Sequence, residues 1–221
     1  MSIETVVLLH GIVKNPSDVW VASHYLRKRG YRTLTPRYSV RDGGIEAMGD
    51  RIWAHIQKNG GGDADKLHFI GHSLGGLIAD AIIRKYKPKN LGRVVMWGTP
   101  LQGCEYADRM NEGNILGPLY RWIYGAAGQE LMLACETMDR ITPLTYEAGM
   151  IAGSRSLNPF SPFFLHDAGP HDGVVPVSRT KRAGLKDHIT LPIDHTFMPF
   201  TPVVWREAAH FLEHGRFSKT G

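Results

Sequence analysis

The 221-residue sequence predicts an α/β protein whose sheet is mostly parallel, and two observations lead to that prediction. Short apolar runs, typical of strands buried on both faces, alternate with longer segments that have helical periodicity. A glycine-rich turn at residues 71–75, with one serine at its centre, joins one such strand to one such helix. Strands that alternate with helices at this short period favour right-handed βαβ units, in which neighbouring strands are parallel.

The first half of the chain contains three strand–helix pairs. Apolar runs predict strands at residues 5–9, 31–35 and 67–70. Segments with an apolar face at helical spacing follow them, at residues 18–29, 45–56 and 74–82. Residues that interrupt regular structure separate these elements: Gly11, Gly30, Pro36 and Pro88.

The second half of the chain is less regular. Further strands are expected at residues 93–98, 146–153 and 185–192, and a closing helix at residues 204–212. Between them the alternation lapses over residues 101–143, which hold apolar stretches at residues 116–124 and 131–133. This insertion predicts either a cap over a site or a helix packed on the sheet beside a long loop. We find no boundary that divides residues 1–221 into more than one domain.

Composition excludes several functional classes. The formal charge is +5, yet the basic clusters at residues 27–29 and 181–182 are too short to track nucleic-acid phosphates, so at most weak contact with an anionic lipid surface is expected. No signal peptide or membrane-spanning run is visible, which predicts a cytoplasmic protein. Cys104 and Cys135 have neither metal-ligand spacing nor a disulfide framework, and whether they pair is left open.

The serine turn has a chemical interpretation. Gly71 and Gly75 flank Ser73 at a distance of two residues each, and a strained strand-to-helix turn needs residues without side chains at those places. The turn would point the serine hydroxyl out of the fold. The N–H groups that open the following helix would suit an oxygen that becomes negative during acyl transfer. A plain glycine-rich connection is the alternative.

The motif Gly-His-Ser-Leu-Gly-Gly at residues 71–76 resembles the nucleophile elbow of α/β-hydrolase lipases and esterases. The resemblance implies a single-domain α/β-hydrolase fold with helices on both faces of the sheet. Its first strand already precedes His10-Gly11, so we expect a sheet that lacks the superfamily's initial antiparallel pair and has about six parallel strands. By the same resemblance, the backbone N–H groups of Ile12 and Leu74 would form the oxyanion hole.

The superfamily order of nucleophile, acid and histidine identifies the two partners of Ser73. Asp172 is followed by Val-Val-Pro, as in the acid-bearing turn of the superfamily, and His195 follows the last expected strand. These residues suit the chemistry, because serine needs an imidazole to take its proton and the imidazole needs a carboxylate to orient it. Rival acids and bases lack one or other context: Asp167, Asp194, His166, His171 and His188.

The resemblance implies a serine hydrolase that cleaves carboxylic esters, with a small acyl ester or lipid as substrate and no cofactor. The same triad could serve a thioesterase, an amidase or an acyltransferase, and the fold could also survive as a non-catalytic binding protein. A metal site is disfavoured because adjacent residues would not easily face one ion; its candidate ligands are His10, His72, His166, His171 and Asp172. No Gly-x-Gly-x-x-Gly follows a strand, which argues against nucleotide binding. Acyl chain length, head group and oligomeric state are not predicted.

Overall fold

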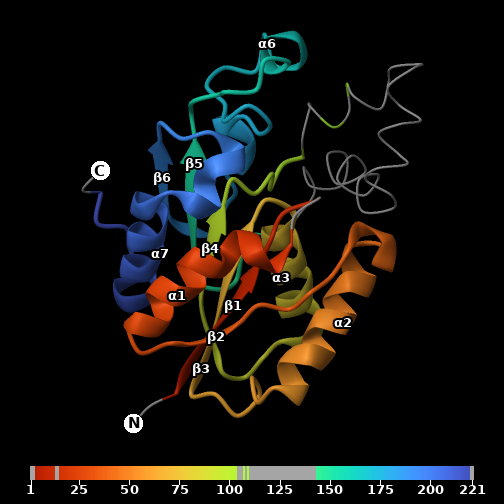
Figure 1. The fold of residues 1–221 in the computed structure, drawn as a ribbon, viewed down its shortest axis with the longest axis vertical. Coiled ribbons are helices and arrows are strands. Elements are labelled where there is room, and N and C mark those ends of the chain that lie inside the picture. Colours follow the sequence, from red (N-terminus) through yellow and green to blue (C-terminus); the bar gives the residue numbers. More distant parts are fainter. Residues whose placement is uncertain (1–2, 13–14, 104–106, 108, 110–142, 220–221) are drawn as a thin grey trace.

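The computed structural model describes residues 3–12, 15–103, 107, 109 and 143–219 (Figure 1). Its strands form a single sheet in the order β2-β1-β3-β4-β5-β6, and every neighbouring pair is parallel. The strand bounds are Glu4–Leu9 (β1), Arg32–Leu34 (β2), Lys66–His72 (β3), Leu91–Trp97 (β4), Ala148–Gly153 (β5) and Leu185–Leu191 (β6). The prediction of a parallel sheet of about six strands is therefore confirmed.

Four longer helices cover the sheet: α1 (Trp20–Lys28), α2 (Ile45–Lys58), α3 (Leu74–Tyr86) and α7 (Pro202–His214). Apolar side chains of α2 and α3 pack with one face of the strands, and those of α1 and α7 pack with the other. Buried side chains alternate between these two cores along β1, as in Val7 and Leu8. Helices on both faces, as expected, are confirmed (Figure 1).

The first helix begins differently from the prediction. A 3-10 turn, η1 (Pro16–Val19), precedes α1, so the expected helix at residues 18–29 is regular only from Trp20. Asn15 caps this turn, because its side chain accepts a hydrogen bond from the Ser17 N–H while Asp18 accepts one from the Asn15 N–H. Other short helices, none of which was predicted as such, are η2 (Val40–Asp42), α6 (Ser161–Phe164), η3 (Val177–Thr180) and η4 (His195–Phe200).

Most of the predicted insertion at residues 101–143 lies outside the described residues. The predicted cap and the two apolar stretches at residues 116–124 and 131–133 therefore remain sequence-based expectations. The possible pairing of Cys104 with Cys135 lies outside the described residues as well. In the part of the chain that is described, no helix combines the length and the apolar character needed to cross a bilayer.

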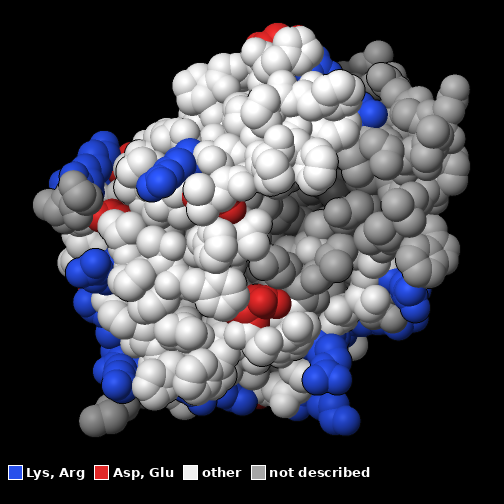
Figure 2. Space-filling model, turned by 45° about the horizontal axis from the view of Figure 1, so that its top comes forward, with Lys and Arg blue, Asp and Glu red and all other residues white. Residues whose placement is uncertain are grey.

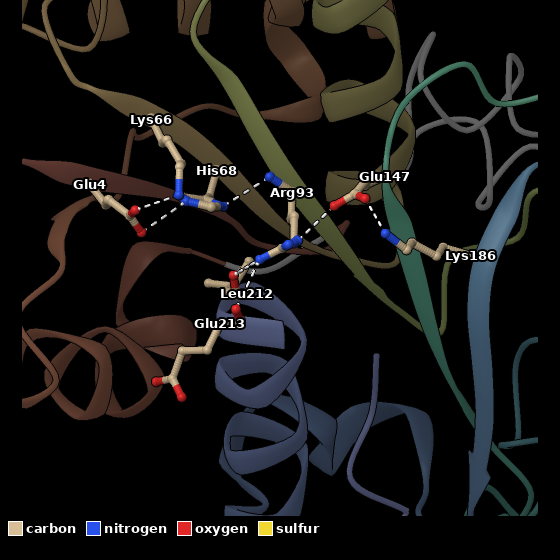
Figure 3. Close-up of polar contacts among 8 residues, drawn as sticks. All are labelled: Glu4, Lys66, His68, Arg93, Glu147, Lys186, Leu212 and Glu213. Atoms are coloured by element: carbon tan, nitrogen blue, oxygen red, sulfur yellow. Dashed lines mark hydrogen bonds and ion pairs between the residues drawn. The ribbon is translucent and has the colours of Figure 1, made fainter. Parts of the chain in front are cut away.

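Charged side chains tie the strands together at their amino ends (Figure 3). Arg93 in β4 donates from Nε to Glu147 at 2.7 Å and from Nη1 to the carbonyl oxygen of Leu212 at 2.7 Å, so it closes the carboxyl end of α7. Lys186 in β6 also binds Glu147. His68 in β3 accepts the Arg93 backbone N–H at 2.9 Å. This network lies at the amino ends of the strands, whereas the site described next lies at their carboxyl ends.

Candidate active site

Ser73 occupies the turn between β3 and α3 in a strained conformation. Its φ of 54° and ψ of −120° lie in a region that residues with side chains rarely adopt. The Ser73 N–H donates to the carbonyl oxygen of Trp97 at 2.8 Å, which fastens the turn to β4. The side chain stands at the amino end of α3, whose first N–H groups have no acceptor within the helix.

The two glycines of the motif are required for steric reasons. A β-carbon at Gly71 would lie 2.4 Å from the backbone nitrogen of Gly76, and one at Gly75 would lie 2.4 Å from the carbonyl oxygen of Leu9. Gly76 belongs to α3 and Leu9 to β1, so neither backbone can move away without disturbing a regular element. The sequence interpretation, in which Ser73 needs neighbours without side chains, agrees with this close packing.

Asp172 and His195 form a buried pair. Asp172 is fully buried, and its Oδ2 lies 2.7 Å from Nδ1 of His195. The other carboxylate oxygen accepts the N–H groups of Val174 at 3.0 Å and Val175 at 2.7 Å. The Val-Val of the sequence pattern thus supplies the hydrogen bonds that hold the carboxylate toward the imidazole.

The rival acids have other partners. Asp194 caps η4 by accepting the Thr196 N–H at 2.9 Å, and its second oxygen accepts the Leu157 N–H at 2.7 Å. Asp167 pairs with Arg109 at 2.9 Å, which is the main reason why its pKa is lowered. Both carboxylates therefore stabilise loops around the site through hydrogen bonds or an ion pair. Asp172 is the acid that the structure brings to His195.

The Asp172–His195 pair lies at the end of β4, beside the serine turn. Gly98 follows β4 with a φ of 54°, and a β-carbon there would come within 3.0 Å of both Asp172 Oδ2 and His195 Nδ1. Within the described residues, no hydrogen bond joins the Ser73 hydroxyl to His195. Catalytic hydrogen bonds are often long before substrate binds, so the arrangement still allows their approach.

The two expected oxyanion donors lie at the carboxyl ends of neighbouring strands. Leu74 is the first residue of α3, and Ile12 lies in the turn after β1, which pairs with β3 up to Leu9 and Gly71. A β-carbon at Gly11 would lie 3.4 Å from the Ser73 Cβ, so the Ile12 turn borders the serine. Tyr38 supports this turn, since its hydroxyl donates to the carbonyl oxygen of His10 at 2.5 Å.

Sequence reasoning missed the roles of two residues beside the site. Gly98 gives space to the Asp172–His195 pair, and its position directly after a predicted strand was the available signal. His72 directly precedes Ser73, and its Nε2 is 3.0 Å from the carbonyl oxygen of His195. No local pattern marks that contact, because 123 positions separate the two residues.

The candidate metal ligands of the sequence have other surroundings. His10 is buried against Tyr38, and burial lowers its pKa. The described residues contain no group of three or more His, Cys, Asp or Glu side chains suited to a metal ion.

The face at the carboxyl ends of the strands is mostly uncharged. Figure 2 shows a hollow on this face, and the described side chains beside it are mostly uncharged apart from an acidic group at its lower edge. Large apolar side chains are exposed in the segments that flank the site. We call these the apolar rim: Leu157, Phe160, Phe163, Phe197 and Phe200. The Leu157–Asp194 hydrogen bond connects the two halves of the rim, because Asp194 caps the helix that carries Phe197 and Phe200.

Residues 3–112 match a family model described as "Putative serine esterase (DUF676)". The match covers just under half of the chain and includes Ile12, Ser73 and Leu74, whereas Asp172 and His195 lie beyond it. No curated protein sequence matches the chain.

Solved structures of lipases and esterases resemble the whole fold at low sequence identity. The mature Bacillus licheniformis lipase is 20% identical with a TM-score of 0.71, and the match covers 89% of this chain and 91% of that one. An Exiguobacterium antarcticum esterase is 15% identical, with a TM-score of 0.62 over 96% and 92% of the two chains. A metagenomic carboxyl esterase is 16% identical, with a TM-score of 0.67 over 88% and 66%. The strained serine turn, the six-stranded parallel sheet and these matches together show that the chain is an α/β-hydrolase-fold protein, similar to lipases and esterases.

Proposed function

We propose that the chain is a serine carboxylesterase that works through an acyl-enzyme intermediate. The observation that supports this most directly is the buried Asp172–His195 hydrogen bond at 2.7 Å, beside a serine held in a strained turn. With Nδ1–H bound to Asp172, the Nε2 atom of His195 carries a lone pair and can accept a proton. A side chain of this kind next to a serine turns a weak nucleophile into an effective one.

In the proposed reaction, Ser73 Oγ attacks the ester carbonyl while its proton passes to His195 Nε2. The backbone N–H groups of Leu74 and Ile12 stabilise the negative oxygen of the tetrahedral intermediate. Collapse breaks the bond to the alcohol, which leaves with the proton from His195. Water then attacks the acyl-serine through the same histidine, and the carboxylic acid is released. Asp172 keeps the imidazole in the required tautomer throughout.

A fluorophosphonate probe and a soluble p-nitrophenyl ester test this proposal. The wild-type protein should hydrolyse the ester and bind one probe molecule, at Ser73. Ser73→Ala should abolish both, since nothing else in the proposed mechanism can form the acyl bond. Ser154→Ala is a matched control because Ser154 is an exposed serine directly after β5, and it should keep both activities. Undiminished hydrolysis by Ser73→Ala would contradict the proposal. Matched thioester, amide and alcohol-acceptor assays separate the alternative reactions of the same triad.

Action on aggregated lipid esters is a second candidate function, and the apolar rim favours it. Phe163 is 77% exposed and Phe160 is 65% exposed, although burial of such side chains is normally favourable. Exposed apolar residues that gather beside a site are typical of surfaces that meet apolar ligands. A lipid surface or the acyl chain of a long ester would cover them.

A further inference from the structure

His72 directly precedes the proposed nucleophile, Ser73, and contacts the proposed base, His195. It ends β3, directly before Ser73, and its side chain is 2% exposed. Its imidazole stands against that of His195, with ring centroids 4.8 Å apart and planes inclined by 41°. The Gly-x-Ser-x-Gly pattern allows any residue at position 72, so the pattern itself does not explain a buried histidine there.

The contact between His72 and the base has a defined direction. Nε2 of His72 lies 3.0 Å from the backbone carbonyl oxygen of His195. A carbonyl oxygen can only accept a hydrogen bond, so Nε2 of His72 carries the proton and donates it. The other side of the ring faces the turn after β1 that contains Ile12, since a β-carbon at Gly11 would lie 2.9 Å from Nδ1. His72 thus fills the space between that turn and residues 194–200, which we call the histidine loop.

This hydrogen bond completes the anchoring of His195. The His195 N–H donates to the carbonyl oxygen of Asp172 at 2.9 Å, and its side chain is bound to the Asp172 carboxylate. The His195 carbonyl is the remaining polar group of the residue's backbone, and His72 satisfies it. Asp172 therefore holds the base from the β5–β6 side, and His72 holds it from the strand that carries the nucleophile.

We propose that His72 is a positioning residue, which uses its Nε2–H to set the place of His195 relative to Ser73. The inference rests on the proposed esterase function. Reaction rates depend steeply on such placement, because a shift of about 1 Å can cost about a hundredfold in rate. The Ser73–His195 hydrogen bond is not formed in this structure, so the approach of the two side chains depends on how the histidine loop is held.

Three substitutions of His72 separate the hydrogen bond from simple packing. In His72→Gln, the amide nitrogen can occupy the place of Nε2 and keep the donor. In His72→Asn, the amide is polar but too short, because its nitrogen reaches only the place of Nδ1. In His72→Leu, the donor is lost while much of the volume is kept, and the buried His195 carbonyl is left without this partner.

His68 provides a matched control on the same strand. It is 1% exposed, and its Nδ1 accepts the Arg93 N–H at 2.9 Å, but it lies at the amino end of the sheet near Glu4 (Figure 3). His68→Leu removes a similarly buried imidazole, together with a part-buried hydrogen bond. It should lower the thermal midpoint without changing the chemistry at the far end of β3.

The experiment measures kcat and KM for a soluble p-nitrophenyl ester, per active site titrated with a fluorophosphonate, together with the thermal midpoint. His72→Leu and His72→Asn should lower kcat per titrated site about tenfold or more with little change in KM, and His72→Gln should stay within about threefold of wild type. His68→Leu should keep the wild-type kcat per titrated site. Titration counts only folded sites, so a merely structural role would leave this quantity unchanged.

Two results would overturn the inference: wild-type kcat per titrated site in His72→Asn, or equal losses in the Gln and Asn variants. The comparison of Gln with Asn decides the matter even where the Leu variant does not fold. Failure of the proposed function looks different, because it would appear as an inactive wild type or an active Ser73→Ala, before any His72 variant is made.

Discussion

His195 is hydrogen bonded to Asp172 twice, once through its side chain and once through its backbone. The Nδ1 atom lies 2.7 Å from the carboxylate, and the N–H donates to the Asp172 carbonyl oxygen at 2.9 Å. Because Val174 and Val175 occupy the second carboxylate oxygen, Asp172 cannot rotate away without breaking several hydrogen bonds. Asp172 and His195 are therefore held as one unit, which has consequences for mutation.

Asp172→Asn should abolish most activity while leaving the fold intact. The amide oxygen would stay on the valine N–H groups, so the NH2 group would face Nδ1 and force the imidazole into the tautomer that cannot accept the serine proton. The corresponding loss in serine proteases is about 10⁴-fold in kcat. Steady-state hydrolysis of a p-nitrophenyl ester measures it. Asp194→Asn and Asp167→Asn are controls that should lose far less, and a larger loss in either would contradict the assignment of the acid.

Gly98→Ala should lower kcat strongly while the protein remains folded. The new methyl group would lie about 3.0 Å from both Asp172 Oδ2 and His195 Nδ1, and would displace the pair. We expect kcat to fall about a hundredfold, since such displacement misaligns the base. Gly30→Ala is the control, because Gly30 has a positive φ of 91° but no neighbour within 4 Å of an added β-carbon. Similar kcat values in the two variants would show that strain, rather than contact with the pair, governs the effect.

The free energy of unfolding should fall as the pH is lowered from neutral. Burial is the largest cause of the lowered pKa of His10, His68 and His188, each below the ordinary value of 6.5. Glu4 opposes this shift at His68, whereas Lys66 and Arg93 add to it. Below about pH 6.5 the unfolded chain binds more protons than the native state, so each histidine destabilises the fold by up to about 1.4 kcal/mol per pH unit.

Urea unfolding at a series of pH values measures this slope. His68→Gln should flatten it between about pH 7 and pH 5, because one buried group no longer titrates. His55→Gln, at an exposed position of α2, should leave the slope as it is. An unchanged slope in the His68 variant would show that this histidine does not contribute to acid sensitivity.

Removal of the apolar rim should affect emulsified substrates selectively. Phe160→Ser combined with Phe163→Ser should lower the rate on a long-chain ester emulsion several-fold and leave hydrolysis of a soluble short ester nearly unchanged. Ile3→Ser is the matched control, since Ile3 is 54% exposed directly before β1, at the opposite end of the sheet. Equal effects on both substrates would argue against contact between the rim and lipid.

Local sequence patterns predicted the sheet and the serine turn because both depend on neighbouring residues. Apolar runs such as the one before His10 mark strands that are buried on both faces, and the glycines around Ser73 answer a steric demand within five positions. The Asp172 turn was identified by its resemblance to the acid-bearing turn of the superfamily, and the backbone N–H groups of the two valines bind its carboxylate.

Long-range contacts and short helices were not predicted. The His72–His195 hydrogen bond and the space at Gly98 depend on which loops meet at the end of the sheet, and no nearby residue signals that meeting. The predicted helix begins at Asp18, whereas Asp18 and Val19 belong to a 3-10 turn and the regular helix begins at Trp20. The sequence suggests Asp194 only as a rival acid, whereas in the structure it caps the 3-10 helix that begins at His195 and binds the Leu157 N–H.

The position of β4 between the two halves of the site also bears on how the chain folds. The turn that carries Ser73 follows β3 on one side of β4, and β5 and β6, next to the loops with Asp172 and His195, lie on the other. The β4–β5 pairing joins Val94 to Ala148, a contact between distant positions that local folding cannot supply. Pairings of this kind form slowly, because chain entropy is lost before the contact is gained. During refolding, we therefore expect helical circular dichroism to recover before the proposed esterase activity, whose return would report the joining of the two halves of the sheet.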